Sequence, residues 1–149
     1  MRSLRNFAVF NIFLFAIVSC TVQLVPDYDE KVYDSTVVIG KQVDSFFIKV
    51  LDTKSDQRIY SRFADDWSSI EAEIGSLLLQ QEARSKNEDM IEATTKTLKM
   101  WTDNKAAFRS DDLFYRNDSR VILHKNRFTD AFTAIAKGEK FLQSTGGLE

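Results

Sequence analysis

Four apolar stripes at helical spacing constrain the fold of this chain more than any other feature. Within each stripe, apolar side chains recur every three or four residues, which is the repeat of one helix face. The stripes occupy residues 28–50, 60–78, 91–108 and 121–141. Short polar segments at 52–56, 110–112 and 117–119 separate them, and Ser85 with Glu88 fits a capping box that starts a helix near Asn87. This pattern predicts an all-α, up-and-down antiparallel four-helix bundle.

Few residues that break helices interrupt these stripes. The chain has one proline and five glycines among 149 residues, and twelve phenylalanines. Large apolar groups with few breakers favour long helices around an aromatic core. Gly40 lies inside the first stripe, where we expect it to allow a close approach of a second helix.

Aromatic residues form the bulk of the expected core. At helical spacing such residues are usually core, although a ligand pocket between the helices is the alternative. The set comprises Phe46, Phe47, Trp67, Trp101, Phe108, Phe128, Phe132 and Phe141. Phe114 and Tyr115 fall outside every stripe. We therefore expect these two to be exposed in a connecting loop and to offer a possible contact surface.

The first twenty residues have the pattern of an export signal. Arg2 and Arg5 supply positive charge, and the twelve residues from Phe7 to Val18 are apolar except for Asn11. Small Ser19 then precedes Cys20. An apolar stretch of this length is shorter than the roughly twenty residues that a membrane-spanning helix needs.

The stretch Ile17-Val18-Ser19-Cys20 resembles the lipobox of bacterial lipoproteins, with Ile17 where the family usually has leucine. The resemblance implies cleavage after Ser19 and attachment of fatty acyl chains, such as palmitate, to Cys20. Thr21 stands where aspartate would imply retention in the inner membrane. The resemblance therefore implies an outer-membrane anchor facing the periplasm, and the rest of the chain is similar to the helical bodies of small envelope lipoproteins.

These signals divide the chain into a cleaved signal peptide at 1–19, a lipidated tether at 20–27 and a helical bundle domain at 28–149. The tether contains Pro26, the only proline. Seven extended residues reach at most about 25 Å, so we expect the bundle to lie close to its membrane.

The net charge argues against nucleic acid as a partner. The full chain carries −2, and removal of Arg2 and Arg5 leaves 18 basic and 22 acidic residues. Binding to nucleic acid generally needs a positive surface that displaces counterions. The partners expected are the membrane, through the acyl chains on Cys20, and another envelope protein.

Residue types that carry chemistry are few. His124 is the only histidine and Cys20 the only cysteine, so neither a zinc site nor a catalytic triad has a marked set of residues. Glu71 and Glu73 are acidic, but no Glu-x-x-His pair of the di-iron type accompanies them. We expect no catalytic residue, metal or cofactor.

The leading hypothesis is a lipid-anchored, non-enzymatic protein-interaction module. A carrier or sensor of a small apolar ligand is the first alternative, and it requires a cavity in the bundle core. An enzyme that acts on the cell wall is the second, and it requires carboxylates in a cleft with displaced pKa values.

Overall fold

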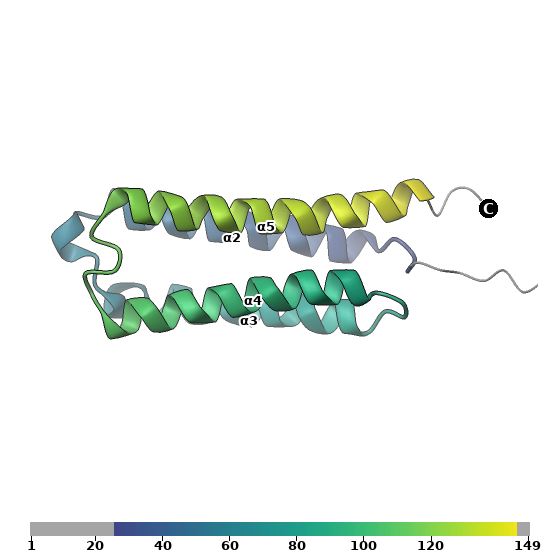
Figure 1. The fold of residues 1–149 in the computed structure, drawn as a ribbon, viewed down its shortest axis with the longest axis horizontal. Helices are drawn as coiled ribbons and strands as arrows, with labels where there is room; N and C mark the ends of the chain where they lie inside the picture. Colours follow the sequence, from purple (N-terminus) through teal and green to yellow (C-terminus); the bar gives the residue numbers. More distant parts are fainter. Residues whose placement is uncertain (1–25, 146–149) are drawn as a thin grey trace, which may run out of the picture.

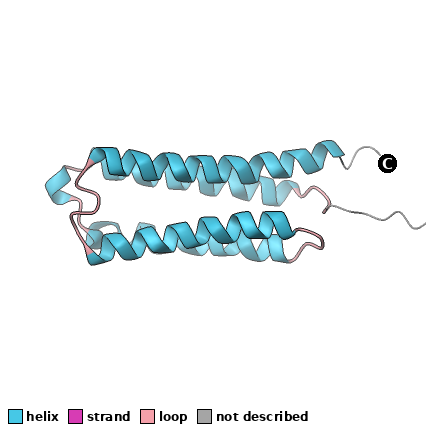
Figure 2. Ribbon diagram, in the orientation of Figure 1, coloured by secondary structure: helices cyan, strands magenta, loops and turns pink. Residues whose placement is uncertain are grey.

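The computed structural model describes residues 26–145, and within them every α-helix belongs to one bundle (Figures 1 and 2). The helices are α2 (Glu30–Asp52), α3 (Tyr60–Glu82), α4 (Glu88–Ser110) and α5 (Asp118–Thr145), with a short 3-10 turn η1 (Ser55–Gln57) between α2 and α3. The prediction of an all-α four-helix bundle is confirmed.

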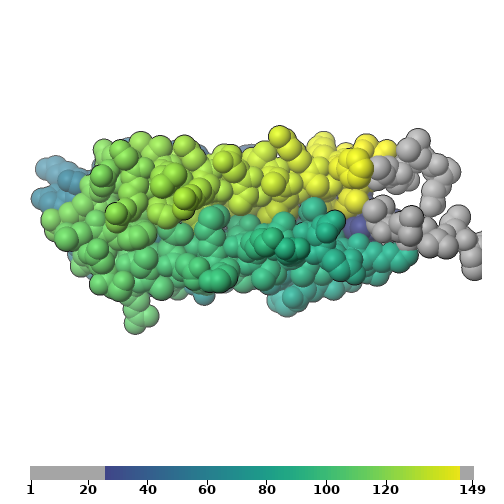
Figure 3. Space-filling model, viewed as in Figure 1, coloured from purple at the N-terminus to yellow at the C-terminus, as the bar shows by residue number. Residues whose placement is uncertain are grey.

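The four helices form two layers that run along one another. Helices α2 and α5 pack side by side in one layer, α3 and α4 form the other, and the pairs α2–α3 and α4–α5 join the layers (Figure 1). Pro26, the α3–α4 turn and the end of α5 line a common groove at one end of the bundle, which we call the terminal end (Figure 1). The other end, with η1 and the α4–α5 loop, is the distal end. Twenty-three residues make α2 about 35 Å long, and the space-filling view shows the elongated body (Figure 3).

Side-chain caps explain where two of the helices begin. Asp29 accepts hydrogen bonds from the backbone N–H groups of Lys31 (2.9 Å) and Val32 (3.3 Å), which caps α2. The side-chain oxygen of Asn117 accepts from the N–H of Ser119 at 2.8 Å at the start of α5. These bonds satisfy donors that the first helical turn leaves free.

The start of α4 differs from the capping box that the sequence suggested. Helix α4 does begin directly after Asn87, but no side chain caps it. The amide of Asn87 points back toward α3 instead, where it donates to the Gln81 carbonyl at 2.9 Å. The expected pairing of Ser85 with Glu88 is therefore wrong, because the turn serves contacts inside the bundle.

Aromatic rings fill the middle of the bundle. Trp67 and Trp101 are fully buried with ring centroids 4.2 Å apart, and the indole N–H of Trp101 donates to the Trp67 carbonyl at 3.0 Å. Phe46 packs edge-on against both indoles at 4.8 and 5.4 Å. Such tilted contacts add to the stability that burial of the rings provides.

Gly40 brings α2 close to α5. A Cβ atom at this position would lie only 3.2 Å from Cβ of Phe132. The expected close helix approach is confirmed, and it explains why the first stripe tolerates a glycine in mid-helix.

A buried arginine ties together the segments at the distal end. Arg58 is 4% exposed and donates to the carbonyls of Leu51 (2.9 Å), Thr53 (2.8 Å) and Tyr115 (3.2 Å), while it forms an ion pair with Asp118. One guanidinium thus joins the end of α2, the start of α5 and the loop before it. Its planar donors suit several acceptors at once.

The last apolar positions of α5 differ from the prediction. Phe141 is 62% exposed, whereas Glu139 (0%) and Leu142 (7%) face the core. The spacing of Phe132, Ile135, Glu139 and Leu142 continues the helical repeat, and Phe141 falls off it. The placement of Phe141 in the core was wrong because a buried glutamate takes the expected apolar position.

Candidate functional site

The residues on which the lipoprotein resemblance rests, Ile17 to Cys20, lie outside the described residues, as does the expected cleavage position at Ser19. The described chain starts at Pro26, six residues after Cys20. The nearest structural features to the expected anchor are therefore those of the terminal end.

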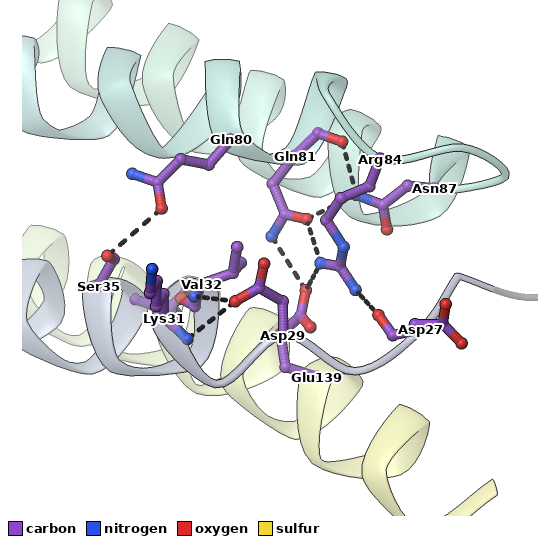
Figure 4. A network of polar contacts seen from close by, with 11 residues as sticks. Asp27, Asp29, Lys31, Val32, Ser35, Gln80, Gln81, Arg84, Asn87 and Glu139 are labelled. Atoms are coloured by element: carbon purple, nitrogen blue, oxygen red, sulfur yellow. Dashed lines mark hydrogen bonds and ion pairs between the residues drawn. The ribbon is translucent and has the colours of Figure 1, made fainter. Parts of the chain in front are cut away.

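The terminal end contains a buried ionic cluster that sequence reasoning missed (Figure 4). Glu139 of α5 is fully buried, and its Oε1 accepts from Arg84 Nη1 at 2.6 Å and from Gln81 Nε2 at 3.1 Å. Arg84 lies in the α3–α4 turn and Gln81 in the last turn of α3. The cluster thus fixes the end of α5 to the turn between the other two helices.

Arg84 also holds the segment that leads to the N-terminus. Its second terminal nitrogen, Nη2, donates to the backbone carbonyl of Asp27 (Figure 4). Asp29 then caps α2 two residues later. The chain is therefore attached to the bundle at Asp27, before its first helix begins.

The α3–α4 turn is built to present these groups. Lys86 has a positive φ of 58°, which reverses the chain direction at some conformational cost for a residue with a side chain. Asn87, 2% exposed, donates to Gln81 Oε1 at 2.6 Å. This bond leaves the Gln81 amide free to donate to Glu139, so the turn, α3 and α5 share one network.

Burial of this cluster makes its pairing energetically important. A buried carboxylate is costly unless it is paired and hydrogen-bonded. Glu139 meets this condition through Oε1, while its Oε2 and the Oδ1 of Asn87 have no partner among the described atoms. The side chain of Arg84 is 12% exposed, so water screens the ion pair only weakly.

The loop at the distal end holds the two residues expected to form a contact surface. Tyr115 is fully buried, and its ring packs 4.9 Å from that of Phe108. Its hydroxyl donates to Asn104 Oδ1 at 3.3 Å, and burial raises its pKa. The expectation that Tyr115 is exposed is wrong, because the loop folds this ring into the core.

Phe114 is half-buried and lies between the core and the solvent. Its ring contacts Tyr115 at 4.8 Å and His124 at 5.5 Å, and the guanidinium of Arg120 lies 5.0 Å from its centroid. An arginine over an aromatic face is a favourable contact. Phe114 is therefore partly accessible to solvent, and its role in a contact surface stays a prediction.

His124 lies at the edge of the core beside this loop. Its pKa is lowered, first by burial and then by the positive charges of Arg127 and Arg120. Its Nδ1 is buried and has no hydrogen-bond partner within the part of the chain that the structure describes. Contacts with Phe114 and Tyr115 are those of a packed side chain at the boundary of the core.

The acidic residues Glu71 and Glu73, which the sequence raised as possible metal ligands, lie at the bundle surface. Glu71 pairs with Lys105 of α4 at 2.9 Å, and Glu73 is exposed. Among residues 26–145, no three side chains of the types that bind metals are grouped to hold an ion. Within the same range, no helix combines the length and the apolar composition needed to cross a bilayer.

The grooves of the described surface lie between neighbouring helices. One of about 490 Å³ runs between α2 and α5 over Gly40 and Phe132. Another of about 230 Å³ at the terminal end is lined by Pro26, Met90 and Phe141 among others. The aromatic rings of the core contact one another instead of lining a chamber.

Comparison with known proteins adds no relative to this picture. No protein-family model, curated protein or solved structure matches the chain.

Proposed function

We propose that this chain is a lipid-anchored envelope protein that acts as a non-enzymatic protein-interaction module. In this proposal the precursor is cleaved after Ser19, and acyl chains on Cys20 hold the protein in the outer membrane, facing the periplasm. Two or more acyl chains on one residue make such attachment stable.

The hydrogen bond from Arg84 to the Asp27 carbonyl is the main structural support for the proposal. It attaches the chain to the bundle only seven residues after Cys20, a span of at most about 25 Å. The terminal end would then face the membrane, and the distal end would project about 35 Å away from it. A body held in this way is suited to present one end to a neighbour.

The contacts of the buried ionic side chains support an interaction module over an enzyme. Arg58 and Glu139 are the charged residues buried in the described chain, and each joins segments far apart in the sequence. Arg58 binds backbone carbonyls, and Glu139 is paired with Arg84. Their roles are structural, whereas an enzyme needs reactive groups that face a cleft.

The alternative function, a carrier of a small apolar ligand, has less support from the packing of the core. Its ligand would occupy the space between the aromatic residues, where Trp67, Trp101 and Phe128 instead pack against neighbouring rings. A ligand would have to displace these contacts, each of which contributes to the stability of the core.

Proximity labelling in the native host tests the proposal. A labelling enzyme is fused after Glu149 in the wild type, in Cys20→Ser, and in a chimera that joins residues 1–27 to an unrelated soluble domain. We expect the wild type to label a set of envelope proteins that neither control labels. Equal labelling by Cys20→Ser would show that the anchor is irrelevant, and equal labelling by the chimera would show that the bundle has no specific partner.

A further inference from the structure

Large apolar side chains are exposed mainly at the distal end. The described residues include eight such side chains, and five of them belong to the distal half of the bundle. These five are Ile48, Ile59, Leu113, Ile122 and Leu123. A gathering of exposed apolar groups in one region is typical of an interaction site.

Part of this region combines apolar and basic side chains. Leu113 is 56% exposed, Leu123 is 48% exposed, and Phe114 is half-buried and packs against the core. Arg116, Arg120 and Arg127 are exposed on the same loop and on the first turns of α5. We call these six residues the distal patch.

The geometry of α5 places the members of the patch together. Arg120, Leu123 and Arg127 are three and four residues apart, so they share one face of the helix. Arg120 covers the ring of Phe114 and donates to its carbonyl at 3.3 Å. The loop and the helix therefore form one continuous surface.

The positive charge of this surface is not neutralised by ion pairs. Within residues 26–145, none of the three arginines of the patch forms an ion pair. Asp118 pairs with Arg58, while Asp111 and Asp112 accept from the backbone N–H groups of Leu113 and Tyr60. Asp130, three residues after Arg127, is exposed and forms no ion pair within the described residues. Burial is the main cause of the lowered pKa of His124, and the positive charges of Arg127 and Arg120 nearby lower it further.

The N-terminal tether cannot cover the patch if the chain is anchored as proposed. The start of the described chain and the end of α5 lie at the opposite end of the bundle, about 35 Å away (Figure 1). The segment between Cys20 and Pro26 reaches only about 20 Å. A symmetric contact with a second copy would bring arginines against arginines, which is unfavourable.

We propose that the distal patch binds an acidic segment of another envelope protein, whose apolar side chains contact Leu113, Phe114 and Leu123 while its carboxylates pair with the arginines. This inference rests on the proposed function and adds the surface and the chemistry of the partner. Bidentate pairing of arginine with carboxylate supplies specificity, and the apolar contacts supply affinity.

Site-specific photo-crosslinking of the full chain in its native host tests the patch. A photoreactive benzoylphenylalanine replaces Leu123, and the control carries it at Leu79, which is 67% exposed near the terminal end. We expect an adduct from position 123 but not from position 79, with an envelope-protein peptide of net negative charge. Reversal of charge by Arg120→Glu with Arg127→Glu should lower its yield by roughly tenfold.

Matched variants distinguish the loss of the patch itself from a change in the net charge of the protein. Lys31→Glu with Lys137→Glu makes the same change in net charge far from the patch and should leave the adduct intact. Leu113→Ser keeps every charge and should also lower the yield. Circular dichroism verifies that each variant remains helical.

Several results would overturn the inference. They are an adduct with lipid or with a second copy, a neutral or basic crosslinked peptide, an unchanged yield after reversal of the two arginines, or no adduct from position 123. If body-specific proximity labelling persists in any of these cases, the interaction module stands and only the patch is refuted. If that labelling is absent as well, both proposals fail.

Discussion

At the scale of single residues, the most consequential side chain is Glu139, a carboxylate inside an otherwise apolar helix face. It is fully buried, and Arg84 and Gln81 supply its hydrogen bonds. Exchange of a buried ion pair for apolar groups is often neutral, whereas removal of one partner is strongly destabilising. The cluster therefore specifies where α5 and the segment before α2 are held.

We predict that Glu139→Ala lowers the free energy of unfolding by about 3 kcal/mol, because it leaves Arg84 and Gln81 without their acceptor. The double variant Glu139→Met with Arg84→Met should recover most of this loss. Asp103→Ala, which removes an exposed ion pair with Lys99, is the control and should change little. Urea unfolding measures all three, and a Glu139→Ala variant as stable as the control would contradict the account.

His124 gives the bundle a dependence on pH. Its pKa is lowered in the folded protein by burial, Arg127 and Arg120, so the unfolded chain takes up the proton first as the pH falls. The folded state therefore loses stability as the pH falls from the unfolded pKa of about 6.5 to the lower folded pKa.

We therefore predict that the wild type loses more stability than His124→Gln between pH 7 and the folded pKa of His124. The chain has no other histidine, so the difference between the two curves reports this residue alone. Urea midpoints measured across this range provide the test. Parallel curves for the two proteins would show that the environment of His124 does not disfavour its charge.

At the scale of elements, the helical glycines Gly40 and Gly75 have different surroundings. A Cβ at Gly40 would meet Phe132 at 3.2 Å, whereas a Cβ at Gly75 would meet nothing within 4 Å. Alanine in a helix is favoured over glycine by about 1 kcal/mol where no contact opposes it.

We predict that Gly75→Ala stabilises the protein by up to about 1 kcal/mol, and that Gly40→Ala gains less or destabilises it, because α2 and α5 must move apart. Thermal unfolding followed by circular dichroism compares the two variants. Equal stabilisation at both positions would mean that α2 and α5 are not held in close contact at Gly40.

The extents of the helices could be predicted from the sequence because their signal is local. Stripes such as 60–78 and 91–108 repeat within one helix, and short polar segments mark their ends. The close approach at Gly40 was also predictable, because a glycine inside an apolar stripe lacks the side chain that would hold a neighbouring helix at a distance.

The contacts of the buried ionic cluster and of Arg58 could not be predicted, because the residues that make them come from separate elements. Glu139 is 55 residues from Arg84 in the sequence, and Arg58 is 57 residues from Tyr115. Nothing local distinguishes Glu139 from a surface glutamate, and its burial became apparent only with the neighbouring helix. Tyr115 was misplaced for the same reason, since a loop residue shows no periodicity by which its burial could be recognised.

At the scale of the whole molecule, the two ends of the bundle differ in character. At the terminal end, Arg84 holds the segment before α2 by its hydrogen bond to the Asp27 carbonyl. The distal end exposes apolar and basic side chains. The two ends of the bundle are therefore suited to different contacts. With the proposed anchor at Cys20, the terminal end would face the membrane and the distal end would point away from it.

The mass of the N-terminal peptide, isolated from the protein in host membranes, tests the proposed anchor most directly. We predict a chain that starts at Cys20 and carries diacylglycerol on the thiol and a further acyl chain on the amino group. A chain that retains residues 1–19, or one that starts at an unmodified Cys20, would contradict it.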